Sequence, residues 1–202
     1  QALFEEGHLQ SASSVVREVT RRDPAFLPAQ SLALKIALAL HHPDASELNG
    51  CVHALKGEPD SQTPIPVWSN ALRQAQSAFD RGDSEEAMAH TLTALACSPE
   101  SPLPAMMHLQ LLEKADDQTG YPDRQAVHTL SEHYRQRFPD CLSILLLRAE
   151  ACFEDGLTDQ GVALLHQAAA WDITGESAVR LWGQAHPYRQ LWQDKLFAPL
   201  EQ

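Results

Sequence analysis

The sequence lacks the charge balance of a nucleic-acid-binding protein and the apolar runs of a membrane protein. Lysine and arginine total 15 against 27 aspartate and glutamate residues, which gives a formal net charge of −12. Phosphate binding requires clustered cations that displace counterions, so we expect no nucleic-acid partner. The apolar stretch 32–40 is interrupted by Lys35 and is far shorter than the roughly 20 residues that cross a bilayer. We therefore expect no membrane span.

Motifs of covalent or metal catalysis are also missing. The chain has no Gly-x-Ser-x-Gly elbow, no glycine-rich phosphate loop and no His-Glu-x-x-His run. No two of its four cysteines, Cys51, Cys97, Cys141 and Cys152, stand at metal-ligand spacing. Such cysteines are usually small buried packing residues of a reducing compartment, so we expect a cytoplasmic protein; an even count of cysteines leaves disulfides open as an alternative.

One pair of residues has the spacing of metal ligands on a helix. His128 and Glu132 lie one helical turn apart, and His133 follows. The same spacing is common on the solvated face of an ordinary helix, which is the interpretation we favour. We therefore predict a protein that is not an enzyme, with no catalytic residue, no metal and no cofactor.

Strand signals are almost absent, because no segment alternates apolar and polar residues for long. Apolar residues recur instead at helical spacing, and glycine, proline and capping residues divide the chain into short segments. The sequence predicts an all-α fold. We expect helices over 9–22, 25–41, 44–56, 67–80, 84–97, 102–115, 123–137, 141–155 and 158–171, and another that starts near Ser177.

A repeated interval organises these segments. Three times a glycine is followed 17 residues later by a residue that closes a helix: Gly7 to Pro24, Gly82 to Pro99 and Gly156 to Ile173. Glycine ends a helix at low cost because it adopts the left-handed conformation. Proline lacks an N–H and keeps its predecessor out of the helical region. The interval therefore predicts a helical hairpin whose second helix lies between glycine and closing residue.

A second recurrence lies inside this interval. A small residue stands five positions after each glycine, and a larger one follows four positions later: Ala12 and Val16, Ala87 and Thr91, and Gly161 and Leu165. The small residues would let two helices approach closely. Capping boxes at Asp83-Ser84-Glu85-Glu86 and Asp44-Ala45-Ser46-Glu47 would start the helices that follow.

This pattern of small residue, larger residue and proline resembles the tetratricopeptide repeat (TPR). The closing residues Pro24, Pro59, Pro99, Pro139 and Ile173 are 35, 40, 40 and 34 residues apart. The resemblance implies a right-handed α-solenoid of about five TPR-like hairpins over 1–173, the first of them truncated. The insertions are 57–66 and 115–122. The second and fourth hairpins fit less well, since each lacks the loop glycine.

The segment 174–202 departs from the repeat and is rich in aromatic residues. We expect a capping helix, broken at Pro187, and an aromatic tail that covers the last hairpin. The alternative is a docking segment for a following domain, for another protein or for a second copy of the chain. The aromatic residues that suggest both interpretations are Trp171, Trp182, Tyr188, Trp192 and Phe197.

In the TPR family the first helices of successive hairpins line a concave groove that holds peptides or helices of partner proteins. Carried onto this chain, the resemblance implies partner-binding residues on three helices. These are Ser69, Leu72, Arg73, Gln76 and Phe79; Leu103, Met106, Met107 and Gln110; and Ser143, Leu146, Leu147, Glu150 and Phe153. For Leu146, Leu147 and Met107, packing between helices is an equal alternative.

The resemblance favours a non-catalytic scaffold or adaptor that binds a peptide or helix of a partner protein. The lysines and asparagines with which chaperone adaptors of the family clamp a terminal carboxylate are missing from these positions, so we do not expect a chaperone-tail receptor. The alternative is a regulatory or substrate-presenting TPR region of a larger enzyme, such as a bacterial transferase.

Overall fold

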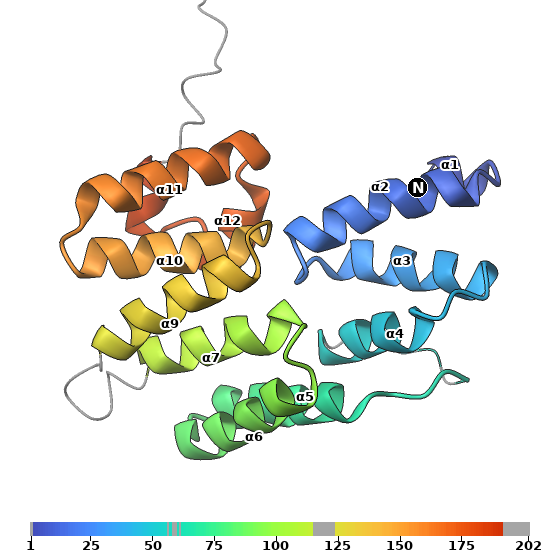
Figure 1. Cartoon of the computed structure of the whole chain (residues 1–202), viewed down its shortest axis with the longest axis horizontal. Helices are drawn as coiled ribbons and strands as arrows, with labels where there is room; N and C mark the ends of the chain where they lie inside the picture. Colours follow the sequence, from blue (N-terminus) through green and yellow to red (C-terminus); the bar gives the residue numbers. More distant parts are fainter. Residues whose placement is uncertain (1, 56, 58–59, 61, 115–123, 192–202) are drawn as a thin grey trace, which may run out of the picture.

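In the computed structural model, helices account for all the regular secondary structure of the described residues, which are 2–55, 57, 60, 62–114 and 124–191 (Figure 1). No strand occurs among them. This confirms the predicted all-α fold. The helices are α1 (Ala2–Glu5), α2 (Leu9–Arg22), α3 (Leu27–Ala39), α4 (Ala45–Ala54), α5 (Val67–Asp80), α6 (Ser84–Cys97), α7 (Pro102–Lys114), α9 (Arg124–Arg137), α10 (Leu142–Glu154), α11 (Thr158–Trp171), α12 (Glu176–Trp182) and the 3-10 helix η1 (Pro187–Leu191).

The loop glycines end their helices as the sequence predicts. Gly7, Gly82 and Gly156 have φ values of 81°, 80° and 74°. At Gly82 the N–H donates to the carbonyl of Phe79, and the next N–H donates to the carbonyl of Ala78. The same pair of bonds recurs at the other two glycines, and it is the Schellman motif that satisfies the last carbonyls of a helix.

The turn between α3 and α4 has a histidine where the turns at Gly7, Gly82 and Gly156 have glycine; the corresponding stretch before α9, 115–123, lies outside the described residues. His41 has a φ of 51° and is the only non-glycine residue with positive φ in the described part of the chain. Its N–H donates to Leu38, and the N–H of His42 donates to Ala37. The helix end therefore has the same backbone motif although histidine replaces glycine there.

Four of the five closing residues form turns of one kind, and the fifth, Pro59, lies outside the described residues. An N–H donates to the carbonyl three residues earlier from Phe26 to Asp23, from Ser101 to Ser98, from Cys141 to Phe138 and from Gly175 to Asp172. Pro24, Pro99, Pro139 and Ile173 occupy the second position of these turns. Proline favours that position because its ring fixes φ near the value required.

The small residues of the repeat lie at close helix contacts. Ala12 is 3% exposed, Ala87 is fully buried and Gly161 is buried. A Cβ atom placed on Gly161 would lie 2.6 Å from the ring of Phe153 on the paired helix. Thr91, the weakest member of the larger series, is fully buried with its hydroxyl donating to the carbonyl of Ala87.

Each helix packs mainly on its neighbours in sequence, and the whole array curls so that its two ends meet (Figure 1). The C-terminal end of α2 lies beside α12, and Arg180 of α12 forms an ion pair with Asp23. Arg21 also reaches Asp140, before α10, at 2.5 Å. The curled array therefore surrounds a central region with helices on all sides.

Some local expectations were wrong. The side chain of Asp83 caps α6 by accepting from the N–H of Glu86, but Asp44 makes no such bond to α4. The carboxylate of Glu86 does not complete a capping box, because it pairs with Arg81 at 2.6 Å. The last α-helix ends at Trp182, before Gly183, rather than at Pro187.

The cysteines only partly behave as buried packing residues. All four are free thiols; Cys141 and Cys152 are buried, Cys51 is half-buried and Cys97 is exposed. Cys97 is the last residue of α6, where the chain leaves the helix for the closing turn. The expectation of burial was therefore wrong for Cys97.

Candidate functional site

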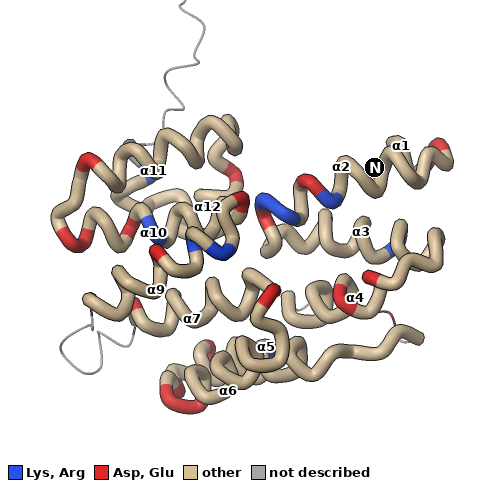
Figure 2. Tube along the Cα trace, in the orientation of Figure 1, with Lys and Arg blue, Asp and Glu red and all other residues tan. Residues whose placement is uncertain are grey.

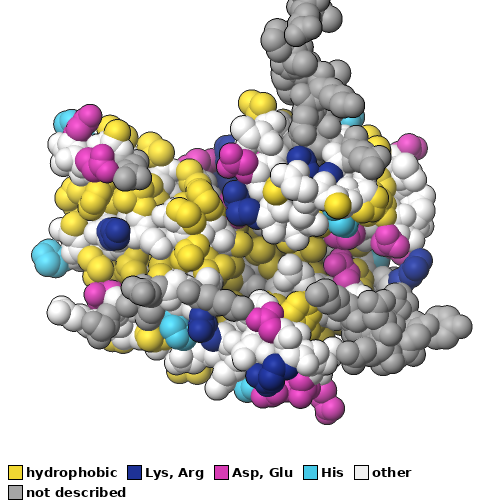
Figure 3. Space-filling view, turned by 180° about the vertical axis from the view of Figure 1, so that it is seen from behind, with side chains coloured by type: hydrophobic (Ala, Val, Ile, Leu, Met, Phe, Trp, Pro, Cys, Tyr) yellow, Lys and Arg dark blue, Asp and Glu magenta, His cyan; other side chains and the backbone are white. Residues whose placement is uncertain are grey.

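A cavity of about 380 Å³ lies in the middle of the curled array. Its walls come from α4, α5, α7, α10 and α12 and from the turn before α3, so segments far apart in the sequence meet there. We call it the central cavity. Figure 3, which views the molecule from behind, shows hydrophobic side chains over the α1–α4 half and in the hollow between the two halves.

Half of the side chains predicted to face a partner line the central cavity. They come from three helices that the resemblance assigns to a common groove: Leu72 and Gln76 from α5, Met106 and Gln110 from α7, and Ser143 from α10. Leu103 and Met107 of α7 line it as well. The structure therefore brings these residues together around one space.

The central cavity combines apolar walls with a few hydrogen-bonding groups. Leu72, Met106 and Met107 are 7%, 6% and 4% exposed, so each presents a small part of its side chain to the cavity. The amide of Gln110 makes no hydrogen bond within the described part of the chain, while the amide of Gln76 donates to Asp80 at 2.8 Å. Apolar surface with a few polar groups is typical of sites for small molecules and peptide side chains.

A polar contact between the ends of the array forms one edge of the central cavity. Asp23, after α2, is 6% exposed and accepts hydrogen bonds from the hydroxyl of Ser177 at 3.0 Å and from Arg180. Arg180 also lies over the ring of Phe26, with 4.5 Å between the guanidinium carbon and the ring centroid. We call this set the closing contact. Sequence reasoning missed it, because no motif links residues more than 150 positions apart.

Three other predicted residues lie in the interface between α4 and α5 or in the core. Ser69 is fully buried, and its hydroxyl donates to the carbonyl of Gly50 and contacts His53, both at 2.8 Å. Arg73 donates to the carbonyl of His53 at 3.4 Å. Phe79 packs against the main hydrophobic cluster.

Glu150 and Phe153 are covered by Trp182, the last residue of α12, and by the segment that follows it. The indole N–H of Trp182 donates to Glu150 at 2.8 Å, and His186 contacts the other carboxylate oxygen at 3.1 Å. The Tyr188 ring lies 4.4 Å from that of Phe153. Up to Leu191 the aromatic segment therefore packs on α10; Trp192 and Phe197 lie outside the described residues.

Three residues that could either face a partner or pack between helices, Leu146, Leu147 and Met107, are buried. Leu146 and Leu147 of α10 are 0% and 2% exposed, and each belongs to a hydrophobic cluster of the core. Met107 belongs to the same core cluster as Leu147, but it also lines the central cavity. Packing therefore accounts for the two leucines, and Met107 has both environments.

Beside Glu150 lies a small cavity of about 180 Å³ with acidic walls. Burial, together with the negative charges of Glu150 and Glu154, raises the pKa of Glu113 to about 8. One carboxylate oxygen of Glu113 is buried and has no hydrogen-bond partner within the described part of the chain. Burial likewise raises the pKa of Glu150.

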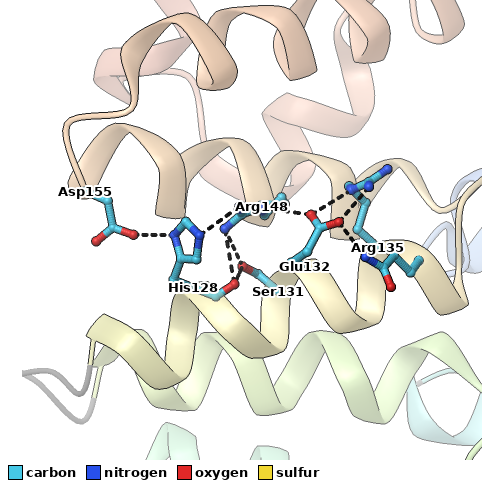
Figure 4. Close-up of polar contacts among 7 residues, drawn as sticks. His128, Ser131, Glu132, Arg135, Arg148 and Asp155 are labelled. Carbon is cyan, nitrogen blue, oxygen red and sulfur yellow. Dashed lines mark hydrogen bonds and ion pairs between the residues drawn. The ribbon is translucent and has the colours of Figure 1, made fainter.

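His128 and Glu132, which have the spacing of metal ligands on a helix, belong to a network around Arg148 (Figure 4). Arg148 of α10 is 5% exposed, and its guanidinium reaches His128 at 3.1 Å and Glu132 at 3.3 Å. Hydrogen bonds from Arg135 lower the pKa of Glu132 to about 2. The network joins α9 to α10.

The hydrogen bonds of this network fix the tautomer of His128. A guanidinium group can only donate, so Nε2 of His128 accepts from Arg148. Nδ1 therefore carries the proton and donates to Asp155 at 2.5 Å. Both ring nitrogens are thus used within the protein. No group of three or more His, Cys, Asp or Glu side chains that could hold a metal ion occurs among the residues described.

No family model, curated protein or solved structure matches this chain. No helix in the described part is long and apolar enough to cross a membrane.

Proposed function

We propose that this protein is a non-catalytic scaffold that binds a short segment of a partner protein in the central cavity. We further propose that the array is a right-handed solenoid of five hairpins of the TPR type. One observation carries the functional proposal: side chains from α5, α7 and α10, selected from the sequence as partner-facing, line one cavity of about 380 Å³.

The chemistry of the cavity suggests the kind of segment it holds. Its volume lies near the lower end of the range of about 300–1,000 Å³ that is typical of ligand sites, so only a few residues fit. Leucine and methionine side chains favour apolar ligand groups, and methionine adapts to varied shapes. Gln110 offers an amide to the main chain of the ligand. Arg180 is already paired with Asp23, so we expect an apolar rather than an anionic segment.

We also propose a cytoplasmic location. All four cysteines are free thiols, and burial raises the pKa of Cys51 and of Cys141 to about 12, so both remain protonated. Proteins of oxidising compartments more often use an even set of cysteines in disulfides.

A substitution that fills the cavity tests the binding proposal. Gln110→Trp places a bulky ring at a half-buried wall position without removing a core side chain. Gln74→Trp adds the same ring at an exposed position of α5 and serves as the matched control. We expect affinity capture followed by mass spectrometry to recover a partner with the parent chain and the Gln74 variant, and to lose it with the Gln110 variant. Equal recovery with all three chains would contradict binding in the central cavity.

A further inference from the structure

A second groove runs along α3, between α2 and α4. It consists of a cavity of about 340 Å³ and a neighbouring one of about 440 Å³, which share Arg17, Thr20, Glu47 and Leu48 as lining residues. The two cavities are therefore continuous, and together we call them the α2–α4 trough. Its larger end reaches the closing turns before α7 and α10.

The floor of the trough is apolar. Ala33, Ile36 and Ala37 of α3 and its C-cap residue Leu40 line one end, and they recur at the spacing of a single helix face. Leu103 and Phe138 line the other end. A groove with two helices as walls and a third as floor has the shape that receives the apolar face of a partner helix.

The two walls of the trough carry opposite charges. Arg17 and Arg21 line it from α2, whereas Asp44 and Glu47 line it from the start of α4. Figure 2 shows the basic residues of α2 and the acidic residues of α4 on opposite sides of α3. Arg21 already pairs with Asp140 and Glu18, but Arg17 forms no ion pair within the described residues.

A buried acceptor lies at the larger end of the trough. Gln30 is 3% exposed and lines this end, and its amide nitrogen donates to the carbonyl of Pro24 at 2.9 Å. The amide oxygen is buried without a hydrogen-bond partner in the part of the chain that the structure describes. An unpaired buried acceptor costs free energy.

We propose that the α2–α4 trough is a second docking site, which binds an amphipathic helix of a partner protein with one acidic and one basic edge. The acidic edge of that helix lies along Arg17 of α2, and its basic edge lies along Asp44 and Glu47 of α4. Its apolar stripe covers the floor formed by α3. The trough and the central cavity share Leu103 as a lining residue and otherwise have different linings, so we expect that one chain can hold two segments at once.

Three designed peptides test this proposal. Each is a labelled helix of roughly 18 residues, long enough to be helical in water, with the same leucine stripe. The edges of the first are acidic and basic, those of the second both acidic and those of the third both basic. We expect fluorescence anisotropy to show that the first peptide binds about tenfold more tightly than the other two, because complementary charges select the partner.

Charge reversals on the walls should change this preference. Arg17→Glu puts a negative charge on the α2 wall beside Arg21, which already pairs with Asp140 and Glu18, so we expect it to favour the peptide with two basic edges. Asp44→Arg puts a positive charge on the α4 wall beside Glu47 and should favour the peptide with two acidic edges. Arg81→Glu and Glu85→Arg make the same changes in net charge at exposed positions near the turn between α5 and α6, and should leave the order unchanged. Circular dichroism verifies that each variant is folded.

Two results would overturn the proposal. One is that the peptide with mixed edges binds no better than a scrambled peptide of the same composition. The other is that the order of the three affinities is the same in the parent chain and in both wall variants. Neither result bears on the central cavity, because Arg17 and Asp44 do not line it. Failure of one site is therefore distinguishable from failure of the other.

Discussion

At the scale of single residues, backbone conformation explains where the helices end. Gly7, Gly82 and Gly156 lie at positive φ in open surroundings, with no atom within 4 Å of where a Cβ would be. A side chain at these positions would not contact neighbouring residues. Glycine is therefore favoured by the positive φ of the backbone and not by a lack of space. His41 adopts the same conformation with a side chain, which L-residues rarely do. Its helix end is therefore strained relative to the others.

This difference predicts that His41→Gly stabilises the protein. Glycine adopts positive φ without the steric cost that a side chain incurs, so we expect the free energy of unfolding to rise by about 0.5–1 kcal/mol. Urea denaturation monitored by circular dichroism measures the change. Gly82→Ala is the converse variant, because it introduces a Cβ at a φ of 80°, and should lose about 1 kcal/mol. An unchanged or lower stability of His41→Gly would contradict the role assigned to this residue.

The buried carboxyl of Glu113 predicts a second effect, on pH dependence. Its pKa is about 8 in the folded protein, against an ordinary value of 4.5 for a glutamate side chain. Between these values the unfolded chain has released the proton and the folded chain retains it, so the free energy of unfolding falls as pH rises. Glu113→Gln removes this penalty. We expect the variant to be more stable than the parent at pH 8, with a difference that shrinks toward pH 4.5.

Glu132 serves as a control because its pKa is shifted in the opposite direction from that of Glu113. Hydrogen bonds from Arg135 lower its pKa to about 2, so its contribution to stability is present above pH 4.5 and is lost as pH falls toward 2. Glu132→Gln should therefore be less stable than the parent at neutral pH. Thermal melts of both variants from pH 3 to pH 8 compare the two trends. Parallel curves for Glu113→Gln and the parent would show that Glu113 ionises normally in the folded state.

At the scale of helices and hairpins, most of the fold could be predicted from the sequence. Four helices have the predicted bounds, and the others with predicted bounds differ by at most two residues at either end. Local backbone chemistry determines these features, because glycine, proline and capping residues act on their immediate neighbours. Contacts that depend on distant residues were not predictable. Asn49, for example, is fully buried and holds the loop after α4 through hydrogen bonds with Asp60 and Thr63.

The close approach of α5 and α6 can be tested at Ala87. This residue is fully buried between the two helices, so Ala87→Leu adds volume where the packing leaves none. We expect a loss of about 1–3 kcal/mol in the free energy of unfolding. Ala89→Leu makes the same change two residues later at an exposed position of α6 and should have little effect. Equal stability of the two variants would show that α5 and α6 do not pack closely at Ala87.

At the scale of the whole molecule, the candidate sites depend on how the array curls. The resemblance to the TPR selected residues of α5, α7 and α10 for one surface, and Leu72, Met106 and Ser143 line one cavity. The same resemblance also selected Ser69, which lies between α4 and α5, and Glu150, which Trp182 of α12 covers. Such a mapping indicates the face of a helix but not what covers that face. The curvature that joins the two ends is a tertiary property, and no local signal predicts it.

The closing contact should therefore hold the ends of the array together. Arg180→Ala leaves the carboxylate of Asp23 buried with only Ser177 as a side-chain donor, so we expect a loss of about 1.5–3 kcal/mol in the free energy of unfolding. We also expect the radius of gyration from small-angle X-ray scattering to increase, because α2 and α12 can then separate. Glu176→Ala is the matched control, since its carboxylate contacts Arg180 at 3.8 Å and is 72% exposed. Asp23→Asn combined with Arg180→Ala should be more stable than Arg180→Ala alone, because a neutral amide is less costly to bury than a charge. If Arg180→Ala matches Glu176→Ala in both stability and radius, the array is held in its curled shape by packing alone.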